Sequence, residues 1–156
     1  MTEEKRREEI RSYVGRFVEA AHLEVTPLVR AEEDAFVIDL SGPDEDLLLD
    51  RRGELLESVQ FILGKVLQKR FGPETRFLVD SANYRQGRER EITEVARRSA
   101  ERVKKLKEPF ELSPMNPYER RLVHLALKDD RGVRTESDGD GFMRRVTIFP
   151  SQGNIK

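Results

Sequence analysis

The sequence contains no cysteine and only two histidines. The lack of cysteine excludes a disulfide framework, a thiolate zinc site and a cysteine nucleophile, and it suits a reducing cytoplasm. Because His22 and His124 lie far apart in the chain, a histidine-rich metal site is not expected. No segment approaches the roughly 20 apolar residues of a membrane span. The N-terminus from Met1 to Arg11 is charged throughout, so we expect no signal peptide.

Motifs that mark common enzyme classes are also missing. The chain has no glycine-rich nucleotide loop ending in Lys-Ser or Lys-Thr, no His-Glu-x-x-His and no Gly-x-Ser-x-Gly. One acidic cluster is better interpreted as surface charge than as a magnesium site; it consists of Asp44, Glu45, Asp46 and Asp50. We therefore expect no catalytic residues, no metal and no cofactor, and a small enzyme such as a nuclease is the least favoured hypothesis.

Charged residues are abundant, yet they nearly cancel. The 156 residues include 29 basic and 30 acidic side chains, which gives a net charge of −1. Residues 1–50 carry a net charge of −8, residues 51–80 carry +2, residues 81–107 carry +5 and residues 108–156 carry 0. A neutral sum argues against nucleic acid only where the charges are evenly mixed. This distribution permits a local basic surface, although solvated helix faces would also explain it.

Hydrophobic periodicity predicts an α+β fold for the first half of the chain. Apolar residues at helical spacing, such as Ile10, Val14 and Phe17, indicate the first helix. The predicted order is a helix at 4–21, strands at 23–30 and 35–40, one or two helical turns at 44–49, a helix at 53–70 and a strand at 75–80.

The second half begins with a long amphipathic helix over 87–107, which is either a connector or the first helix of a second domain. Asn116-Pro117-Tyr118-Glu119 is typical of a helix start, with an N-cap, a proline in the first turn and a capping-box carboxylate. This helix should run to about Lys128. Strands are expected at 133–138 and 143–149, joined by a turn at 138–141.

The loop before the helix at 53–70 is the first candidate binding site. It contains Arg51, Arg52 and Gly53. A helix N-terminus presents unpaired N–H groups that attract phosphate, and the two guanidinium groups add bidentate donors. An ordinary exposed turn would have the same composition, so this alternative stays open.

The helix that starts near Asn116 carries the second candidate site. At about 100° per residue, Arg120, Arg121, His124 and Lys128 fall on one face, and Tyr118, Leu122, Leu125 and Ala126 fall on the opposite one. The basic face could contact successive phosphates, and a histidine can hydrogen-bond to a base or stack on it. The alternative is an amphipathic helix whose histidine merely hydrogen-bonds locally.

Arg144 and Arg145 on the final strand are the third candidate. Adjacent residues of a strand point to opposite faces, so we expect only one of them to join a basic surface with the 120–128 helix. A charged edge that discourages strand pairing is the alternative interpretation.

Together these features resemble a known tandem of domains. The order of elements in the first half is similar to a type II KH domain, and Met115–Leu127 looks like the signature of an R-three-H domain, named for Arg-x-x-x-His, here Arg120 and His124. With Val79-Asp80 and Tyr84-Arg85 after the KH-like strand, the chain resembles the bacterial Jag family, also called KhpB.

This resemblance implies a KH-like domain at 1–80, a connecting basic helix at 81–108 and an R-three-H domain at 109–156. It also implies a cytoplasmic protein that binds single-stranded RNA, with single-stranded DNA as a possible ligand, and that is linked to cell elongation and division. Homo- or heterodimers, including pairing with a small stand-alone KH protein, are implied as well. The implied nucleic-acid contacts are the 50–53 loop in the first domain and Arg120 with His124 in the second.

Two departures from the family pattern bear on function. The KH loop should read Gly-x-x-Gly, but Asp50 occupies the first glycine position. Its bulk and negative charge, and its ability to cap the following helix, should weaken binding at this loop. The chain also begins almost directly at the KH-like helix, whereas relatives often have an extra N-terminal domain. The acidic first third and the Asp50 departure motivate the alternative to RNA binding, an adaptor whose KH-like half binds a partner protein.

Overall fold

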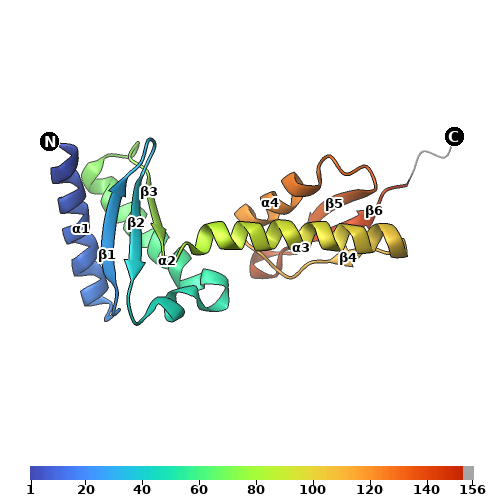
Figure 1. The fold of residues 1–156 in the computed structure, drawn as a ribbon, viewed down its shortest axis with the longest axis horizontal. Helices are drawn as coiled ribbons and strands as arrows, with labels where there is room; N and C mark the ends of the chain where they lie inside the picture. The colour runs from blue at the N-terminus through green and yellow to red at the C-terminus, as the bar shows by residue number, and fades with distance from the viewer. Residues whose placement is uncertain (153–156) are drawn as a thin grey trace. The chain divides into compact units, whose positions relative to one another are not determined.

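The computed structural model describes residues 1–152 and divides the chain into two compact units. The first unit comprises Met1–Arg85, and the second begins at Gln86. Figure 1 shows the elements of each unit. Residues 153–156, which belong to the predicted second domain, lie outside the described residues.

The first unit is a three-stranded sheet with two helices packed on a shared core (Figure 1). Its elements are α1 (Glu3–Ala20), β1 (Thr26–Ala31), β2 (Phe36–Ser41), α2 (Glu45–Phe71) and β3 (Phe77–Asp80). β1 pairs with β2 in antiparallel fashion, and β3 joins β2 in parallel. This order confirms the α+β arrangement predicted for this half.

The sequence explains why these helices form and which face they bury. The Thr2 hydroxyl caps α1 by accepting a hydrogen bond from the Lys5 N–H. Ile10, Val14 and Val18 recur every fourth residue and enter the core. α2 combines the two predicted helical segments, with non-helical backbone between them at residues 50–53.

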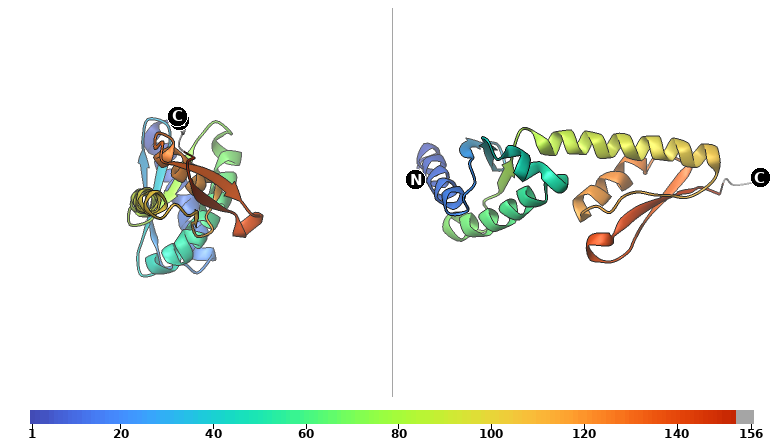
Figure 2. Two further views of the ribbon diagram at one scale, coloured as in Figure 1. Left: turned by 90° about the vertical axis from the view of Figure 1, so that its right-hand side faces the viewer. Right: turned by 90° about the horizontal axis from the view of Figure 1, so that it is seen from below.

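The second unit builds its core from two helices and a second three-stranded sheet. Its elements are α3 (Tyr84–Leu106), β4 (Phe110–Glu111), α4 (Pro117–Leu127), β5 (Val133–Asp138), the 3₁₀ turn η1 (Gly141–Met143) and β6 (Arg145–Pro150). The sheet is antiparallel in the order β4-β6-β5. β5 and β6 form the hairpin drawn in orange and red in Figure 2.

α3 contributes directly to the second core. Ile92, Ala96, Ala100 and Val103 are buried among residues of α4, β5 and β6. The prediction set residues 81–108 apart as a connecting helix, but the burial of this helical face makes most of α3 part of the second unit. Residues 84 and 85 at its start belong to the first unit.

Candidate nucleic-acid interface

The N-terminus of α4 is fixed by a complete capping box, as the sequence predicts. The side-chain oxygen of Asn116 accepts a hydrogen bond from the Glu119 N–H at 2.8 Å. The Glu119 carboxylate accepts one in return from the Asn116 N–H at 3.3 Å. Pro117 occupies the first turn. The N–H groups of a first turn have no acceptor within the helix, so the absence of an N–H in proline costs no hydrogen bond there. α4 therefore starts at a defined residue.

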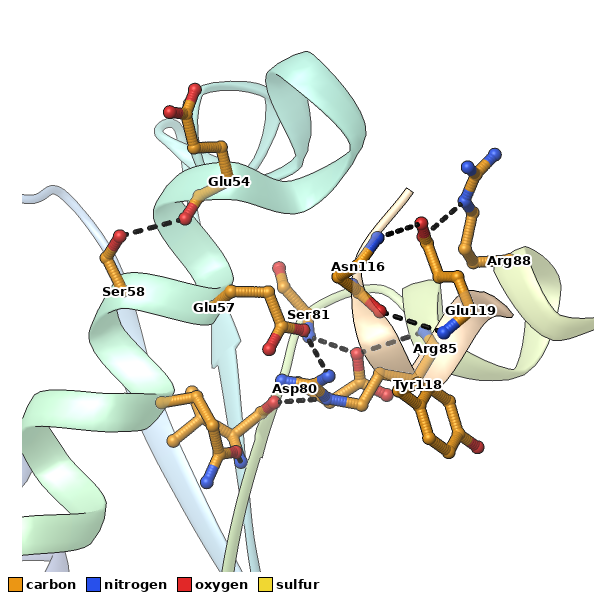
Figure 3. A network of polar contacts seen from close by, with 12 residues as sticks. Glu54, Glu57, Ser58, Asp80, Ser81, Arg85, Arg88, Asn116, Tyr118 and Glu119 are labelled. Carbon is orange, nitrogen blue, oxygen red and sulfur yellow. Dashed lines mark hydrogen bonds and ion pairs between the residues drawn. The ribbon is translucent and has the colours of Figure 1, made fainter. Parts of the chain in front are cut away.

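A residue of α3 also holds this capping group. Arg88 Nε donates a hydrogen bond to the second carboxylate oxygen of Glu119 at 2.9 Å, and Figure 3 shows Arg88, Glu119 and Asn116 joined in this way. The side chains of Arg88 and Glu119 are only 16% and 7% exposed. The ion pair therefore ties α3 to the start of the helix that carries the Arg-x-x-x-His signature.

Arg120 and His124 lie on the side of α4 that faces β5, and both are half-buried. Arg120 Nη1 donates to the Met115 carbonyl at 2.6 Å. The His124 Nδ1 atom lies 2.6 Å from the Thr135 hydroxyl oxygen on β5. A local hydrogen bond of His124 was predicted as the alternative to contact with a base, and this hydrogen bond is present. It also orients the ring, which leaves the other ring nitrogen, Nε2, for an external group.

Burial and charge act together on His124. Removal of the ring from water lowers the pKa of His124 below its ordinary value of 6.5, and the positive charge of Arg120 lowers it further. The imidazole is therefore mainly neutral at pH 7. A phosphate placed beside it would favour the protonated form.

Arg121 and Lys128 are exposed on the crest of α4. Neither makes a hydrogen bond or an ion pair within residues 1–152. The structure thus places Arg120 and His124 on the flank of α4 beside β5, and Arg121 and Lys128 on its exposed side.

The apolar face of α4 differs from the prediction. Its buried residues are Glu119, Val123 and Leu127. Tyr118 and Leu125, predicted on the apolar side, are 57% and 50% exposed. Val123 and Leu127, four residues apart, form a buried stripe that hydrophobicity indicates, and Glu119 joins it through its ion pair with Arg88, which hydrophobicity alone does not predict.

Arg144 and Arg145 have structural partners. Arg144 precedes β6 and donates hydrogen bonds to the carbonyls of Gly139 and Ser137, at 2.9 and 3.4 Å. Arg145 pairs with Glu111 at 3.4 Å. Because Arg145 lies opposite Asp138 and alternates with the buried Val146, it lies on the sheet face away from α4. Arg145 therefore lies apart from Arg120 and His124. The backbone of Arg144 lies nearer to Arg120, because the Arg144 carbonyl accepts a hydrogen bond from the Met115 N–H at 3.1 Å and the Met115 carbonyl accepts one from Arg120.

The loop in the first unit adopts an unusual backbone. Asp50 is extended, whereas Arg51, Arg52 and Gly53 have φ angles of 49°, 59° and 74°. Left-handed conformations cost a non-glycine residue roughly 1–2 kcal/mol, so the flanking helices must hold this loop in place. The Asp50 carboxylate accepts a hydrogen bond from the Arg51 N–H at 2.9 Å, and it therefore occupies one backbone donor of the loop.

Gly53 is required on two grounds. Its φ angle is positive, and a Cβ atom at this position would lie 2.7 Å from the Tyr84 ring. Arg51 and Arg52 are exposed beside it. The second glycine position of the KH-like loop thus has a packing role in addition to any contact with phosphate.

Two partners of the signature residues were missed from the sequence. Thr135 is 11 residues from His124, and Arg88 is 31 residues from Glu119. Strand alternation with the buried Val133 could have placed Thr135 on the inner face of the sheet. We find no sequence signal that would have identified Arg88.

No group of three or more metal-ligating side chains occurs in the part of the chain that the structure describes. Among residues 1–152, no helix combines the length and the apolar character needed to cross a membrane.

Comparison with known proteins adds to this geometry. Residues 90–150 match the family model of the R-three-H domain, a match that includes most of α3 together with α4 and the sheet. The chain is 38% identical over 117 residues to the RNA-binding protein KhpB of Clostridium symbiosum, which covers 75% of this chain and 53% of that protein. It is 29% identical over 111 residues to the RNA-binding protein KhpB of Bacillus subtilis, covering 70% of this chain and 53% of that protein. The chain spans about half the length of these curated relatives.

Proposed function

Because the chain belongs to the KhpB family and carries an R-three-H domain at residues 90–150, we propose that it is a non-catalytic cytoplasmic protein that binds single-stranded RNA. Both relatives are named RNA-binding proteins. We further propose that this binding serves the regulation of cell elongation and division. Single-stranded DNA is a weaker candidate ligand, because the 2′-hydroxyl group gives a protein a means of preferring RNA.

The observation that carries this proposal is the basic flank and crest of α4. Arg120 and His124 are held in defined orientations by Met115 and Thr135. Arg121 and Lys128 on the adjacent crest have no protein partner within residues 1–152. In our proposal the free cations contact phosphates, and His124 donates to a phosphate or contacts a base. The fixed side chains supply orientation without an entropic cost at binding.

The loop of the first unit is a second, weaker contact in this proposal. Arg51 makes no side-chain hydrogen bond within the described residues and is free to reach a phosphate. Asp50 opposes this by placing a carboxylate at the same loop. We therefore assign the larger share of affinity to α4, and a smaller share to Arg51, Arg52 and the backbone at Gly53.

The double variant Arg120→Ala with His124→Ala tests the main contact. A hydrogen bond to a charged group contributes about 1.5–3 kcal/mol, so the variant should bind a labelled single-stranded oligoribonucleotide at least about tenfold more weakly, measured by fluorescence anisotropy. Circular dichroism checks that the variant is folded. Unchanged affinity in a folded variant would refute the role of α4. An added incubation with magnesium should leave the RNA intact, and cleavage would contradict a non-catalytic protein.

A second candidate role, in place of the adaptor hypothesis, is self-association through the first unit, and one feature of α2 favours it. The exposed face of α2 carries Phe61, Ile62 and Val66, which are 67%, 46% and 46% exposed. Glu54 and Lys69 lie on the same face, and their side chains have no partner within residues 1–152. Lys65 also lies on this face, with its ammonium group 5.8 Å from the centre of the Phe61 ring. A largely apolar centre with opposite charges at its two ends can form a self-complementary two-fold interface.

We propose a second copy of this chain as the occupant of that face. In an antiparallel pair of α2 helices related by a two-fold axis between Phe61 and Ile62, Glu54 of each copy falls opposite Lys69 of the other. The same axis brings the aromatic and aliphatic side chains of both copies together. A heterodimer with a small KH protein would use the same apolar centre, but it does not account for the reciprocal charges.

A further inference from the structure

α3 presents a second basic surface that lies outside the Arg-x-x-x-His signature. Within the second unit, its exposed face carries five cations, namely Arg90, Arg97, Arg98, Arg102 and Lys105. At about 100° per residue they fall within an arc of about 140°. The opposite face of α3 is the buried one.

The acidic residues on this face are engaged locally. Glu91 pairs with Arg88 at 3.1 Å, Glu94 lies 3.9 Å from Arg98, and Glu101 pairs with Lys104 at 2.6 Å. Four cations remain without a hydrogen bond or an ion pair among residues 1–152; they are Arg90, Arg97, Arg102 and Lys105, and the Arg102 guanidinium lies 5.0 Å from the centre of the Phe110 ring. The face therefore keeps uncompensated positive charge, whereas an ordinary solvated helix would alternate its charges in pairs.

Two of the cations border a groove between α3 and the end of α4. The groove has a volume of about 350 Å³ and is lined by Arg97, Arg98, Glu101, Ala126, Leu127 and Asp130. Asp130 accepts hydrogen bonds from Lys104 Nζ at 2.8 Å and from the Gly132 N–H at 2.9 Å. The bond from Lys104 is the main reason that the pKa of Asp130 lies below its ordinary value. Asp130 shares Lys104 with Glu101, so one cation offsets two carboxylates; with Arg97 and Arg98 added, these five groups still leave a net charge of +1 at the groove.

The lining of the groove suits a nucleotide. Guanidinium groups bind phosphate through paired N–H donors and also stack on flat rings. Leu127 is almost fully buried in the core, so Ala126 is the apolar side chain of the lining that a sugar or a base edge would contact. A groove with net positive charge that follows the backbone is one of the two components of single-strand binding sites, and the planar guanidinium groups of Arg97 and Arg98 are the groups here that could stack on a base.

The groove and the signature residues lie on opposite flanks of one helix. His124 contacts β5, with Arg120 one turn before it on α4, whereas Ala126, roughly 120° to 160° away from these two around the helix, borders the groove beside α3. The crest between the two flanks carries Arg121 and Lys128. We propose that one RNA strand contacts the Arg120–His124 flank, crosses this crest, and continues into the groove, where Arg97 and Arg98 hold its backbone. This inference rests on the proposed RNA-binding function and extends its site from α4 to α3.

The test uses the full chain with Arg97→Ala and Arg98→Ala combined. The matched control, Lys5→Ala with Arg6→Ala, removes the same charge from two exposed residues of α1 in the first unit. Two labelled oligouridines serve as probes, one of about 4 nucleotides, which fills a single site, and one of about 16 nucleotides, which can span both. Affinity is measured by anisotropy over a series of salt concentrations.

For the longer probe we expect the groove variant to bind at least about fivefold more weakly than the control. The slope of log K against log salt should become shallower by about 1.4, because each of two phosphate contacts contributes about 0.7 on a single strand. The shorter probe should bind groove variant and control equally.

Three other outcomes would overturn the inference in distinguishable ways. If the groove variant and the control bind the longer probe alike, while Arg120→Ala with His124→Ala still weakens binding, the groove is not part of the site and the proposed function stands. If the groove variant loses affinity for both probes by the same factor, the loss does not come from a second contact that only the longer probe reaches. If the wild-type chain binds neither probe, the proposed function fails and this inference fails with it.

Discussion

His124 is the residue of the candidate interface whose charge changes near neutral pH. Its burial, and then the charge of Arg120, lower the pKa of His124 below 6.5. The neutral form is thus favoured by folding, and this stabilisation is present above pH 6.5 and is lost as the pH falls through the lowered pKa. A bound phosphate acts in the opposite direction, because it stabilises the imidazolium.

RNA affinity should therefore rise as the pH falls from above 6.5 toward the lowered pKa of His124. A single coupled proton changes affinity by at most about tenfold per pH unit. His124→Gln should remove this dependence, whereas His22→Asn, at an exposed position of the first unit, should retain it. Binding isotherms over the pH range provide the measurement. An identical pH profile in wild type and His124→Gln would show that the ring does not meet a phosphate.

At this scale, the sequence predicted residues whose signals are local and missed those whose partners are distant. Arg120 and His124 were found because they are four residues apart on one helix. Thr135 and Arg88 were not, because their roles depend on tertiary packing. For Arg144, strand alternation did not apply, because β6 begins only at Arg145 and the guanidinium of Arg144 is bound to the turn at Ser137 and Gly139.

The start of α4 depends on the contact between two helices. Removing Arg88 leaves the Glu119 carboxylate buried without its ion pair, a change that costs about 3–5 kcal/mol in typical cases. We expect Arg88→Ala to lower the free energy of unfolding of the second unit by about 3 kcal/mol. Urea unfolding, followed by NMR at the amide groups of α4, measures this unit separately from the first.

Glu91→Ala is the matched control for this prediction. It removes the other carboxylate bound to Arg88, but Glu91 is 63% exposed, and an exposed ion pair contributes at most about 1 kcal/mol. Equal destabilisation by Arg88→Ala and Glu91→Ala would mean that the contact with Glu119 does not stabilise α4.

Whole helices and strands were predicted correctly where a local sequence signal marks them. The capping box and the proline predicted the start of α4, and apolar periodicity predicted α1 and the second part of α2. β4 was missed because a two-residue strand has no period; it exists because Phe110 and Glu111 pair with Ile148 and Thr147 of β6. The strand predicted from residue 143 begins at Arg145, because Gly141–Met143 form a 3₁₀ turn.

Over the whole molecule, charge is divided between segments with different proposed partners. The first 50 residues carry a net charge of −8, and residues 81–107 carry +5. Such a chain should bind RNA through its second unit despite a net charge of −1. The first unit, with its exposed apolar face on α2, is the part suited to protein contacts.

Self-association through α2 is testable by light scattering over a range of protein concentrations. The wild-type chain should form dimers, and Phe61→Asp should be monomeric, because it places a carboxylate at the centre of the apolar contact.

Glu54→Lys or Lys69→Glu alone should weaken the dimer, because each brings like charges together across the two-fold axis. Combining both reversals in one chain should restore it, since opposite charges meet again with their positions exchanged. Recovery of the dimer would distinguish a symmetric interface from non-specific hydrophobic association through Phe61, because non-specific association does not depend on the pairing of Glu54 with Lys69. A wild-type chain that remains monomeric would refute the homodimer. If the wild-type chain then captures a separate protein from nuclease-treated lysate and Phe61→Asp does not, the face binds a different partner.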